Sequence, residues 1–501
     1  MNVLFTRSAG FMQHVPKNEN MPSTVLNNTL CLSLSSIIGL SISFVFNVFL
    51  ARSLGVDQFG DFSLAMTFVT IFSVLVEFSL DFLIVRDIAH TPARAPAYFG
   101  NALALKGILF LVAVILIRIT TYIMRYPAHV CVLIYILSLG LLFDGAKRCC
   151  VSLFEASQHM QFTAVLLVLE RTLFVIIGLV ALSLYGTVTA VIVCYIFVQM
   201  FISIASYMMV HSRLGFAPQR PDYTLCKRLT RNAFPFFLTS MTAALYADID
   251  KLFLFSIQSG NAVGLYAAAY KLIAIPIQFS NAFHRALYPI LSRYAATQDR
   301  VLLSEMCRRS MRYLMLGAVP VGVGMMVFAK PLMRATFGET YLQGTIALQI
   351  LVLAYVLEFF NPFLSRVLYA IGRERSVLTA VTVGTVSNIS LNILLIPLYS
   401  LTGAAIATLV SASLIFVILW LSILPIFHEV SLSAMAIRPA LAGLSMWVGC
   451  ILLTGISPLI VVLAAGCIYI GFLVLTKEIS SEELLAVRRT MRTVAWVVIK
   501  R

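Results

Sequence analysis

Four polar side chains share one face of an otherwise apolar stretch in the second half of the chain. They are spaced seven, three and four residues apart, as on one side of a helix: Lys271, Gln278, Asn281 and Arg285. A charge at the centre of a bilayer costs about 2.5–3.5 kcal/mol, so such groups normally face a cavity or a partner. We interpret this stripe as the lining of a water-filled, cationic cavity.

Other polar residues inside apolar stretches have two interpretations that the sequence leaves open. Asp248 and Lys251 share a helix face, whereas Asp250 points roughly opposite, and the first two either form an internal ion pair or contact a ligand. Asn, Ser and Thr positions either line the cavity or join helices through hydrogen bonds. Arg171 directly follows Glu170, which favours a structural role for that arginine.

The composition identifies the kind of protein that must position these residues. Of the 501 residues, 60% are hydrophobic and 11% are charged, whereas soluble domains average about 45–50% apolar and about 25% charged. The net charge of +15 would suggest nucleic acid in a soluble chain, but this apolar background excludes that partner as a default. The nine cysteines contain no C-x-x-C pair, and we expect no metal and no cofactor.

The apolar stretches are long enough to cross a bilayer as helices and lack the strict alternation of barrel strands. We count fourteen, near 29–51, 60–84, 101–124, 129–150, 163–184, 187–210, 233–256, 262–286, 310–333, 342–366, 376–397, 402–424, 435–456 and 458–476. The short connections leave no room for a soluble catalytic domain, and no nucleotide-binding G-x-x-x-x-G-K-[ST] motif is present in the sequence. The sequence therefore predicts an all-α transporter and not an enzyme.

The distribution of basic residues predicts the orientation. With the N-terminus inside, 28 of the 36 Lys and Arg residues fall in cytoplasmic segments, Lys106, Lys147 and Arg148 among them, and five fall outside. This asymmetry follows the positive-inside rule and predicts that both termini are cytoplasmic.

Two pairs of segments repeat a pattern along the chain. Gly55, Gly60, Phe62 and Ala65 resemble Gly260, Gly264, Tyr266 and Ala269, and Leu184–Tyr185 resembles Leu398–Tyr399. We interpret this as two six-helix lobes in parallel repeat, with two appended helices. The expected organisation is a cytoplasmic segment 1–24, lobes 25–210 and 233–424 joined by a basic linker 211–232, appended helices 425–476 and a basic tail 477–501.

Several fragments, in this order and spacing, resemble bacterial polysaccharide flippases of the O-antigen type, within the multidrug/oligosaccharidyl-lipid/polysaccharide exporter superfamily. The fragments are Ala51-Arg52-Ser53-Leu54-Gly55-Val56-Asp57-Gln58-Phe59-Gly60, Asp248-Ile249-Asp250-Lys251, Val263-Gly264-Leu265-Tyr266-Ala267-Ala268-Ala269-Tyr270-Lys271, Phe337-Gly338-Glu339-Thr340-Tyr341 and Leu391-Asn392-Ile393-Leu394-Leu395-Ile396-Pro397. The resemblance covers roughly residues 25–425.

The resemblance implies a flippase of the bacterial inner membrane that moves undecaprenyl-diphosphate-linked oligosaccharide by alternating access, coupled to protons or sodium. The product would be O-antigen, capsule or exopolysaccharide, and a polysaccharide polymerase and a chain-length regulator would be partners. The substrate-binding candidates are Arg52, Lys251, Tyr266, Tyr270, Lys271, Gln278, Asn281 and Arg285, and the ion-coupling candidates are Asp81, Asp248, Asp250 and Glu358. The alternative is a multidrug cation antiporter of the same superfamily, which would favour an acidic cavity.

Overall fold

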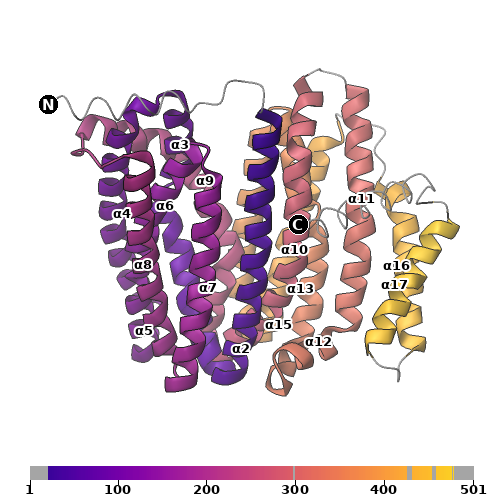
Figure 1. Ribbon diagram of the computed structural model, residues 1–501. Coiled ribbons are helices and arrows are strands. Elements are labelled where there is room, and N and C mark those ends of the chain that lie inside the picture. The colour runs from indigo at the N-terminus through magenta and orange to yellow at the C-terminus, as the bar shows by residue number, and fades with distance from the viewer. Residues whose placement is uncertain (1–20, 297–299, 426–431, 454–457, 477, 479–501) are drawn as a thin grey trace, which may run out of the picture. The chain divides into compact units, whose positions relative to one another are not determined.

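The computed structural model describes residues 21–296, 300–425, 432–453, 458–476 and 478 (Figure 1). Helices dominate because only helices and closed barrels satisfy the backbone polar groups within a bilayer. The first helices are α2 (Met21–Glu77), α3 (Leu80–His90), η1 (Pro92–Arg94), α4 (Ala95–Ile123), α5 (Ala128–Ser138), α6 (Gly140–Ala156), α7 (Met160–Tyr185), α8 (Val188–Leu214) and α9 (Tyr223–Ile257). They are followed by α10 (Gly260–Ala296), α11 (Arg300–Val327), α12 (Ala329–Thr336), η2 (Glu339–Gly344), α13 (Thr345–Glu358), α14 (Asn361–Ala370), α15 (Glu374–Ile423), α16 (Leu432–Leu452) and α17 (Pro458–Leu475).

The fourteen predicted spans are confirmed. Within the described residues, nine helical stretches are long and apolar enough to cross a membrane. Two of these stretches, Ile38–His90 and Glu374–Ile423, each contain two predicted spans. They bend where the backbone leaves the helical region, at Gly55 and Ser400 respectively. The remaining three spans correspond to the more polar helix α9 and to the shorter apolar helices α16 and α17.

The chain divides into two compact units. Unit 1 contains Met1–Ile275, Met333–Ala347 and Val381–Ser411, and unit 2 contains Pro276–Leu332, Leu348–Ala380 and Ala412–Arg501. Both α10 and α15 therefore contribute to each unit. The lobe boundaries expected from the sequence remain a prediction, and each unit is described below by itself.

Unit 1 is built on α2, whose first half packs along α7 (Figure 1). A large apolar core joins α3, α4, α6, α8 and α9, with fully buried Leu80, Leu153 and Ile202 among its members. A second contact in this unit joins α2 to the start of α10. A Cβ at Gly60 would lie 1.8 Å from the carbonyl oxygen of Gly260, and one at Gly264 would lie 2.1 Å from that of Val56. Only glycine permits this close backbone approach.

This contact brings together the two segments that the sequence pattern relates. Gly60 belongs to the first copy, and Gly260 and Gly264 belong to the second. The other related pair is less alike, because Gly186 and Ser400, each following a Leu-Tyr pair, have similar φ values of 60° and 52° but ψ values of 20° and −132°. The first pair of related segments is thus in direct backbone contact, whereas the second pair shares a break after Leu-Tyr but not its conformation.

Three lysine and arginine residues that the orientation count places in cytoplasmic segments form ion pairs within unit 1, and two of them are buried there. Lys106, 2% exposed, is 2.6 Å from Asp81. Lys147, 6% exposed, lies 2.6 Å from Asp144 and 2.8 Å from Glu170. The third, Arg148, lies 2.9 Å from both Glu77 and Asp144. Counting lysine and arginine residues along the sequence does not distinguish those that form buried ion pairs from those that set the orientation in the membrane.

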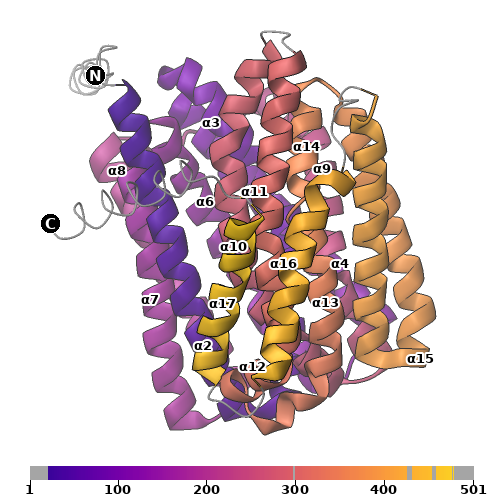
Figure 2. The same ribbon diagram turned by 90° about the vertical axis from the view of Figure 1, so that its right-hand side faces the viewer.

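Unit 2 contains the two appended helices. In this unit α16 and α17 pack against each other and against α11 (Figure 2), and their shared core includes Ala442, Ala465 and Leu473. Glu478, just after α17, holds the ends of this group together through Arg312 at 3.0 Å and Arg438 at 2.9 Å. The appended helices are thus fastened by apolar packing along their length and by ion pairs at one end.

Candidate functional site

The centre of the candidate site is an ion pair on α9. Lys251 and Asp248 stand three residues apart, and the ammonium donates to Oδ1 of the carboxylate, with both side chains largely buried. The ion pair that the sequence left as one of two alternatives is therefore present. Lys251 Nζ also lies 5.3 Å from the centre of the Tyr270 ring on α10, a favourable cation–π distance.

Two further cations lie within electrostatic range of this pair. Lys271 follows Tyr270 on α10 and is half-buried, and its charge interacts with those of Lys251, Asp248 and Arg171. Within the described residues no ion pair or hydrogen bond engages the Lys271 ammonium. We call Arg171, Lys251 and Lys271 the cationic cluster. With Asp248 as their neighbouring acid, the three cations leave a net positive charge.

Arg171 is the member that the sequence did not single out. Its guanidinium is exposed on α7 and donates to the Ser43 hydroxyl of α2 at 3.4 Å. Gly39 makes room for it, because a Cβ there would touch the Arg171 side chain at 3.4 Å. The adjacent Glu170 pairs with Lys147 instead, so within the described part of the chain Arg171 has no carboxylate partner. An arginine in the middle of an apolar span could have indicated this position, but the adjacent Glu170 favoured a structural role for it.

A buried carboxyl group lies on the opposite face of α9, as the spacing of Asp248, Asp250 and Lys251 predicted. Asp250 is 2% exposed, and its Oδ2 accepts hydrogen bonds from Tyr266 at 2.5 Å and Thr408 at 3.1 Å. Its Oδ1 has no hydrogen-bond partner within the described structure. A buried acceptor without a donor costs about 1–3 kcal/mol, so it marks a place where a proton or cation would be favourable.

Two asparagines on α15 extend this polar region within unit 1. Asn392 donates to Asn388 at 2.9 Å, and Asn388 donates to Ser411 at 3.3 Å. Both asparagines are fully buried, and Oδ1 of Asn392 also lacks a partner among the described residues. The region thus offers two uncompensated oxygen atoms, the donor type that hard cations prefer.

Tyr266 and Tyr270 stand between the cationic cluster and the buried carboxyl group. Their rings are 6.1 Å apart on successive turns of α10. Tyr270 faces Lys251, whereas the fully buried Tyr266 is bound to Asp250. The Tyr266 ring is therefore not accessible for sugar stacking in this structure.

The other predicted site residues lie elsewhere. Arg52 is exposed and donates to the carbonyl oxygen of Thr336 at 2.6 Å, at the C-terminus of α12, where a cation complements the helix dipole. Asp81 pairs with Lys106. Gln278, Asn281 and Glu358 are half-buried in unit 2, and the side chain of Arg285 lies outside the described residues.

Together, the many spans, the polar residues inside them and the repeat define a helical membrane transporter. The model of the family "Polysaccharide biosynthesis protein" matches residues 25–295, more than half of the chain, and the MatE model matches residues 235–394. The chain belongs to the polysaccharide biosynthesis protein family, within the superfamily of multidrug, oligosaccharidyl-lipid and polysaccharide exporters.

Individual relatives are distant in sequence. The probable low-salt glycan biosynthesis flippase Agl15 of Haloferax volcanii is 22% identical, over 77% of this chain and 80% of that protein. The probable flippase AglR of the same organism is 24% identical, over 74% and 77%. A structure of the lipid II flippase MurJ in an inward closed conformation aligns with a TM-score of 0.72 at 16% identity, covering 90% of this chain and 99% of that one. The likeness to the MurJ structure establishes the fold of this chain.

Proposed function

We propose that this protein flips an undecaprenyl-diphosphate-linked oligosaccharide from the cytoplasmic to the outer leaflet of a bacterial inner membrane by alternating access. The observation that carries the proposal is the cationic cluster within the spans of a chain of this family. Two relatives support the same class of cargo: Agl15 is named as a probable glycan biosynthesis flippase, and AglR is named as a probable flippase. The product would be O-antigen, capsule or exopolysaccharide.

The cationic cluster suits a diphosphate because charge-assisted hydrogen bonds strengthen where water is scarce. Arg171 presents a planar donor set, and Lys271 presents a compact charge that no ion pair engages among the described residues. Lys251 is already paired with Asp248, so it contributes charge while its position stays fixed. Arg52, Tyr270, Gln278, Asn281 and Arg285 remain proposed contacts for other parts of the substrate.

We assign ion coupling to Asp250. It combines burial, a short hydrogen bond from Tyr266 and an oxygen atom without a partner in the described structure. Binding of a proton or sodium ion there would alter the Tyr266 hydrogen bond, and Tyr270, one turn away on α10, faces Lys251. Asp81, Asp248 and Glu358 are weaker candidates for the coupling ion, since the first two are already paired with lysines.

A multidrug cation antiporter is the second candidate. The MatE match and a likeness to an inward-facing multidrug resistance MATE family transporter, with a TM-score of 0.61, favour it. The positive cluster disfavours it, because an organic cation would be repelled by Arg171 and Lys271. A drug-efflux assay in a sensitive host separates the two, and increased resistance to cationic dyes would support the antiporter.

The experiment for the proposed function uses a deletion strain. Loss of the protein should remove the glycan from the cell surface and accumulate lipid-linked glycan on the cytoplasmic face. Lys271→Ala and Arg285→Ala should each reduce export at normal protein abundance, while Lys227→Ala, an exposed lysine near the start of α9, should not. Unchanged surface glycan in the deletion strain would refute the flippase.

The deletion strain complemented with tagged versions of the protein tests the remaining proposals. Reporter fusions should place both termini in the cytoplasm, and co-purification should recover a polysaccharide polymerase and a chain-length regulator. An N-terminal fusion accessible from outside would overturn the topology, and recovery of the purified protein without either partner would overturn that assembly.

A further inference from the structure

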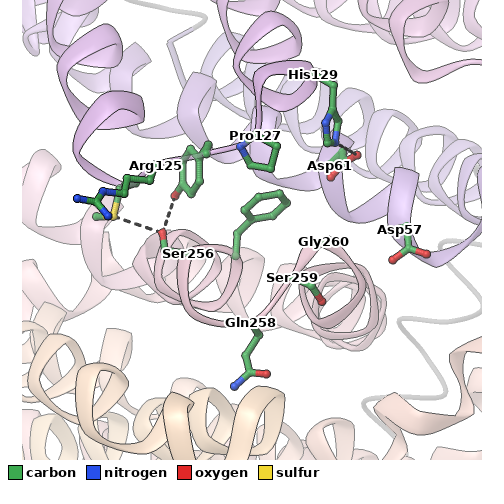
Figure 3. Close-up of a pocket in the computed structure, with 12 residues that line it drawn as sticks. Asp57, Asp61, Arg125, Pro127, His129, Ser256, Gln258, Ser259 and Gly260 are labelled. Carbon is green, nitrogen blue, oxygen red and sulfur yellow. Dashed lines mark hydrogen bonds and ion pairs between the residues drawn. The ribbon is translucent and has the colours of Figure 1, made fainter.

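A pocket of about 420 Å³ opens at one end of unit 1, and no residue of the cationic cluster lines it. Three turns form it: the helical turn of α2 after Gly55, the α4–α5 turn at Met124–His129, and the α9–α10 turn at Phe255–Gly260 (Figure 3). Its volume lies in the range of roughly 300–1,000 Å³ typical of small-molecule sites. We name it the terminal pocket.

The position of the pocket in unit 1 follows from the direction of its helices. The starts of α4 and α9 meet at the opposite end, where the backbone N–H of Asp222 donates to Asn101 at 2.8 Å. The pocket lies where α4 and α9 end, so it is on the other side of the membrane from the linker 211–232. With that linker cytoplasmic, the pocket faces outward.

The walls of the pocket are fixed. Oδ1 of Asp61 lies so close to Gly260 that a Cβ there would be 2.8 Å away. The buried Tyr126 donates to the carbonyl oxygen of Leu252 at 3.1 Å and packs against Phe255 with ring centres 5.2 Å apart. Burial raises the pKa of Tyr126 to about 12, which keeps its phenol protonated as the donor. A pocket held in this way is preorganised for a ligand.

Several polar groups in the pocket have unused hydrogen-bonding capacity. The carboxylate of Asp57 and the hydroxyl of Ser259 have no partner among the described residues. Gln258 donates its amide to Ile396 at 3.1 Å, which leaves its Oε1 as a free acceptor. Carboxylate, amide oxygen and hydroxyl together match a ligand whose groups both donate and accept hydrogen bonds, as sugar hydroxyls do.

The charges of the pocket favour an uncharged ligand. Asp61 faces His129 at 3.5 Å, Asp57 lies on the same side, and Arg125 lies on the opposite side (Figure 3). The pocket thus contains two carboxylates, one guanidinium and one imidazole that is charged only when protonated, so it has no large net charge of either sign. No group of three His, Cys, Asp or Glu residues that could hold a metal ion occurs among the described residues, at this place or elsewhere. The pocket is lined both by these polar groups and by the buried aromatic rings of Tyr126 and Phe255, which is the mixed lining that a saccharide requires.

From this geometry we propose that the terminal pocket binds an uncharged sugar residue of the exported glycan on the outer side of the membrane. The assignment rests on the proposed function and adds a second, outward-facing subsite that receives the glycan after it leaves the cationic cluster. Asp57 and Gln258 accept hydrogen bonds from sugar hydroxyls, and Ser259 donates one.

The test is saturation-transfer NMR on the full-length protein in lipid nanodiscs, with glucose, N-acetylglucosamine, glucosamine and glucuronate as probes. A neutral sugar should receive saturation, and Asp57→Asn, Gln258→Ala and the pocket-filling Ser259→Trp should each reduce the signal at least threefold. Asp222→Asn, an exposed aspartate at the opposite end, is the matched control and should leave the signal unchanged. Thermal unfolding verifies that each variant is folded.

Three outcomes would overturn the proposal: no signal from either neutral sugar, signal only from a charged sugar, or equal signals in the wild type and all three pocket variants. Failure here is distinct from failure of the proposed function. If the deletion strain keeps its surface glycan, the flippase is refuted whatever the sugar binding. If the deletion strain loses its glycan but the pocket variants bind like the wild type, the pocket assignment alone fails.

Discussion

The phenol of Tyr266 donates a 2.5 Å hydrogen bond to Oδ2 of Asp250, and both side chains are almost completely buried. Tyr270, one turn further along α10, faces the cationic cluster. A carboxyl group whose environment is nearly closed, yet whose second oxygen has no partner among the described residues, is suited to exchange a proton or small cation.

The first prediction concerns Asp250. Asp250→Asn removes the charge but keeps the shape, so we expect export to fall at least tenfold and to lose its dependence on the ion gradient. Tyr266→Phe removes one charge-assisted hydrogen bond, worth about 1.5–3 kcal/mol. It should shift the half-maximal sodium or proton concentration about tenfold or more while preserving maximal export. Transport into vesicles under imposed gradients measures both effects, and gradient-dependent export by Asp250→Asn would contradict the assignment.

The second prediction separates the two roles suggested for Arg171. Arg171→Ala should lower glycan export at least tenfold without lowering protein abundance, because the guanidinium is exposed and its one described hydrogen bond is long. Arg171→Lys keeps the charge and should retain part of the activity. Export in the deletion strain complemented with each variant is the measurement. If the role of Arg171 were structural, Arg171→Ala would instead reduce the abundance of the protein. Normal export by Arg171→Ala would exclude Arg171 from substrate binding.

The third prediction concerns the buried pair Lys106–Asp81. Lys106→Met leaves the Asp81 carboxylate without its cation and should destabilise the protein by about 3–5 kcal/mol. The double variant with Asp81→Leu removes both charges and should recover much of the loss. Thermal unfolding in detergent and the amount of folded protein in membranes report on this. Equal unfolding temperatures for wild type and Lys106→Met would show that the pair contributes nothing.

The fourth prediction concerns the contact between the repeats. Gly60→Ala and Gly264→Ala each force a Cβ into a backbone carbonyl and should strongly reduce the yield of folded protein. Gly107→Ala is the control, since no atom lies within 4 Å of its Cβ position and alanine favours the helix by about 0.5–1 kcal/mol. Size-exclusion profiles of the three variants decide the matter, and a normal profile for Gly60→Ala would disprove the tight contact.

The fifth prediction uses the bend in α15. Ser400 has a left-handed φ of 52°, which costs a non-glycine residue about 1–2 kcal/mol. Ser400→Gly should therefore raise the unfolding temperature, and the reciprocal Gly186→Ser should lower it. An unchanged or lower unfolding temperature for Ser400→Gly would contradict the strain assigned to this residue.

The spans, the repeat and the opposite faces of Asp248 and Asp250 were predictable because they depend on local spacing and apolar length. The pairing of Lys106 with Asp81 and of Lys147 with Glu170 was not, since each of these two ion pairs joins different helices, 25 and 23 positions apart. The same limit applies to Arg171, because Glu170 is its neighbour in sequence but pairs with Lys147 of α6. The terminal pocket is assembled from three separate turns and left no continuous pattern to detect.

The pairing of Lys106 with Asp81 also constrains how the protein enters the membrane during synthesis. Asp81 at the start of α3 leaves the ribosome 25 residues before Lys106, so the acid is already available when α4 reaches the translocon. Inserting the two helices together would avoid placing an unpaired lysine in lipid, at about 2.5–3.5 kcal/mol. The order of residues along the chain thus means that the acid which pairs with Lys106 is synthesised before Lys106 itself.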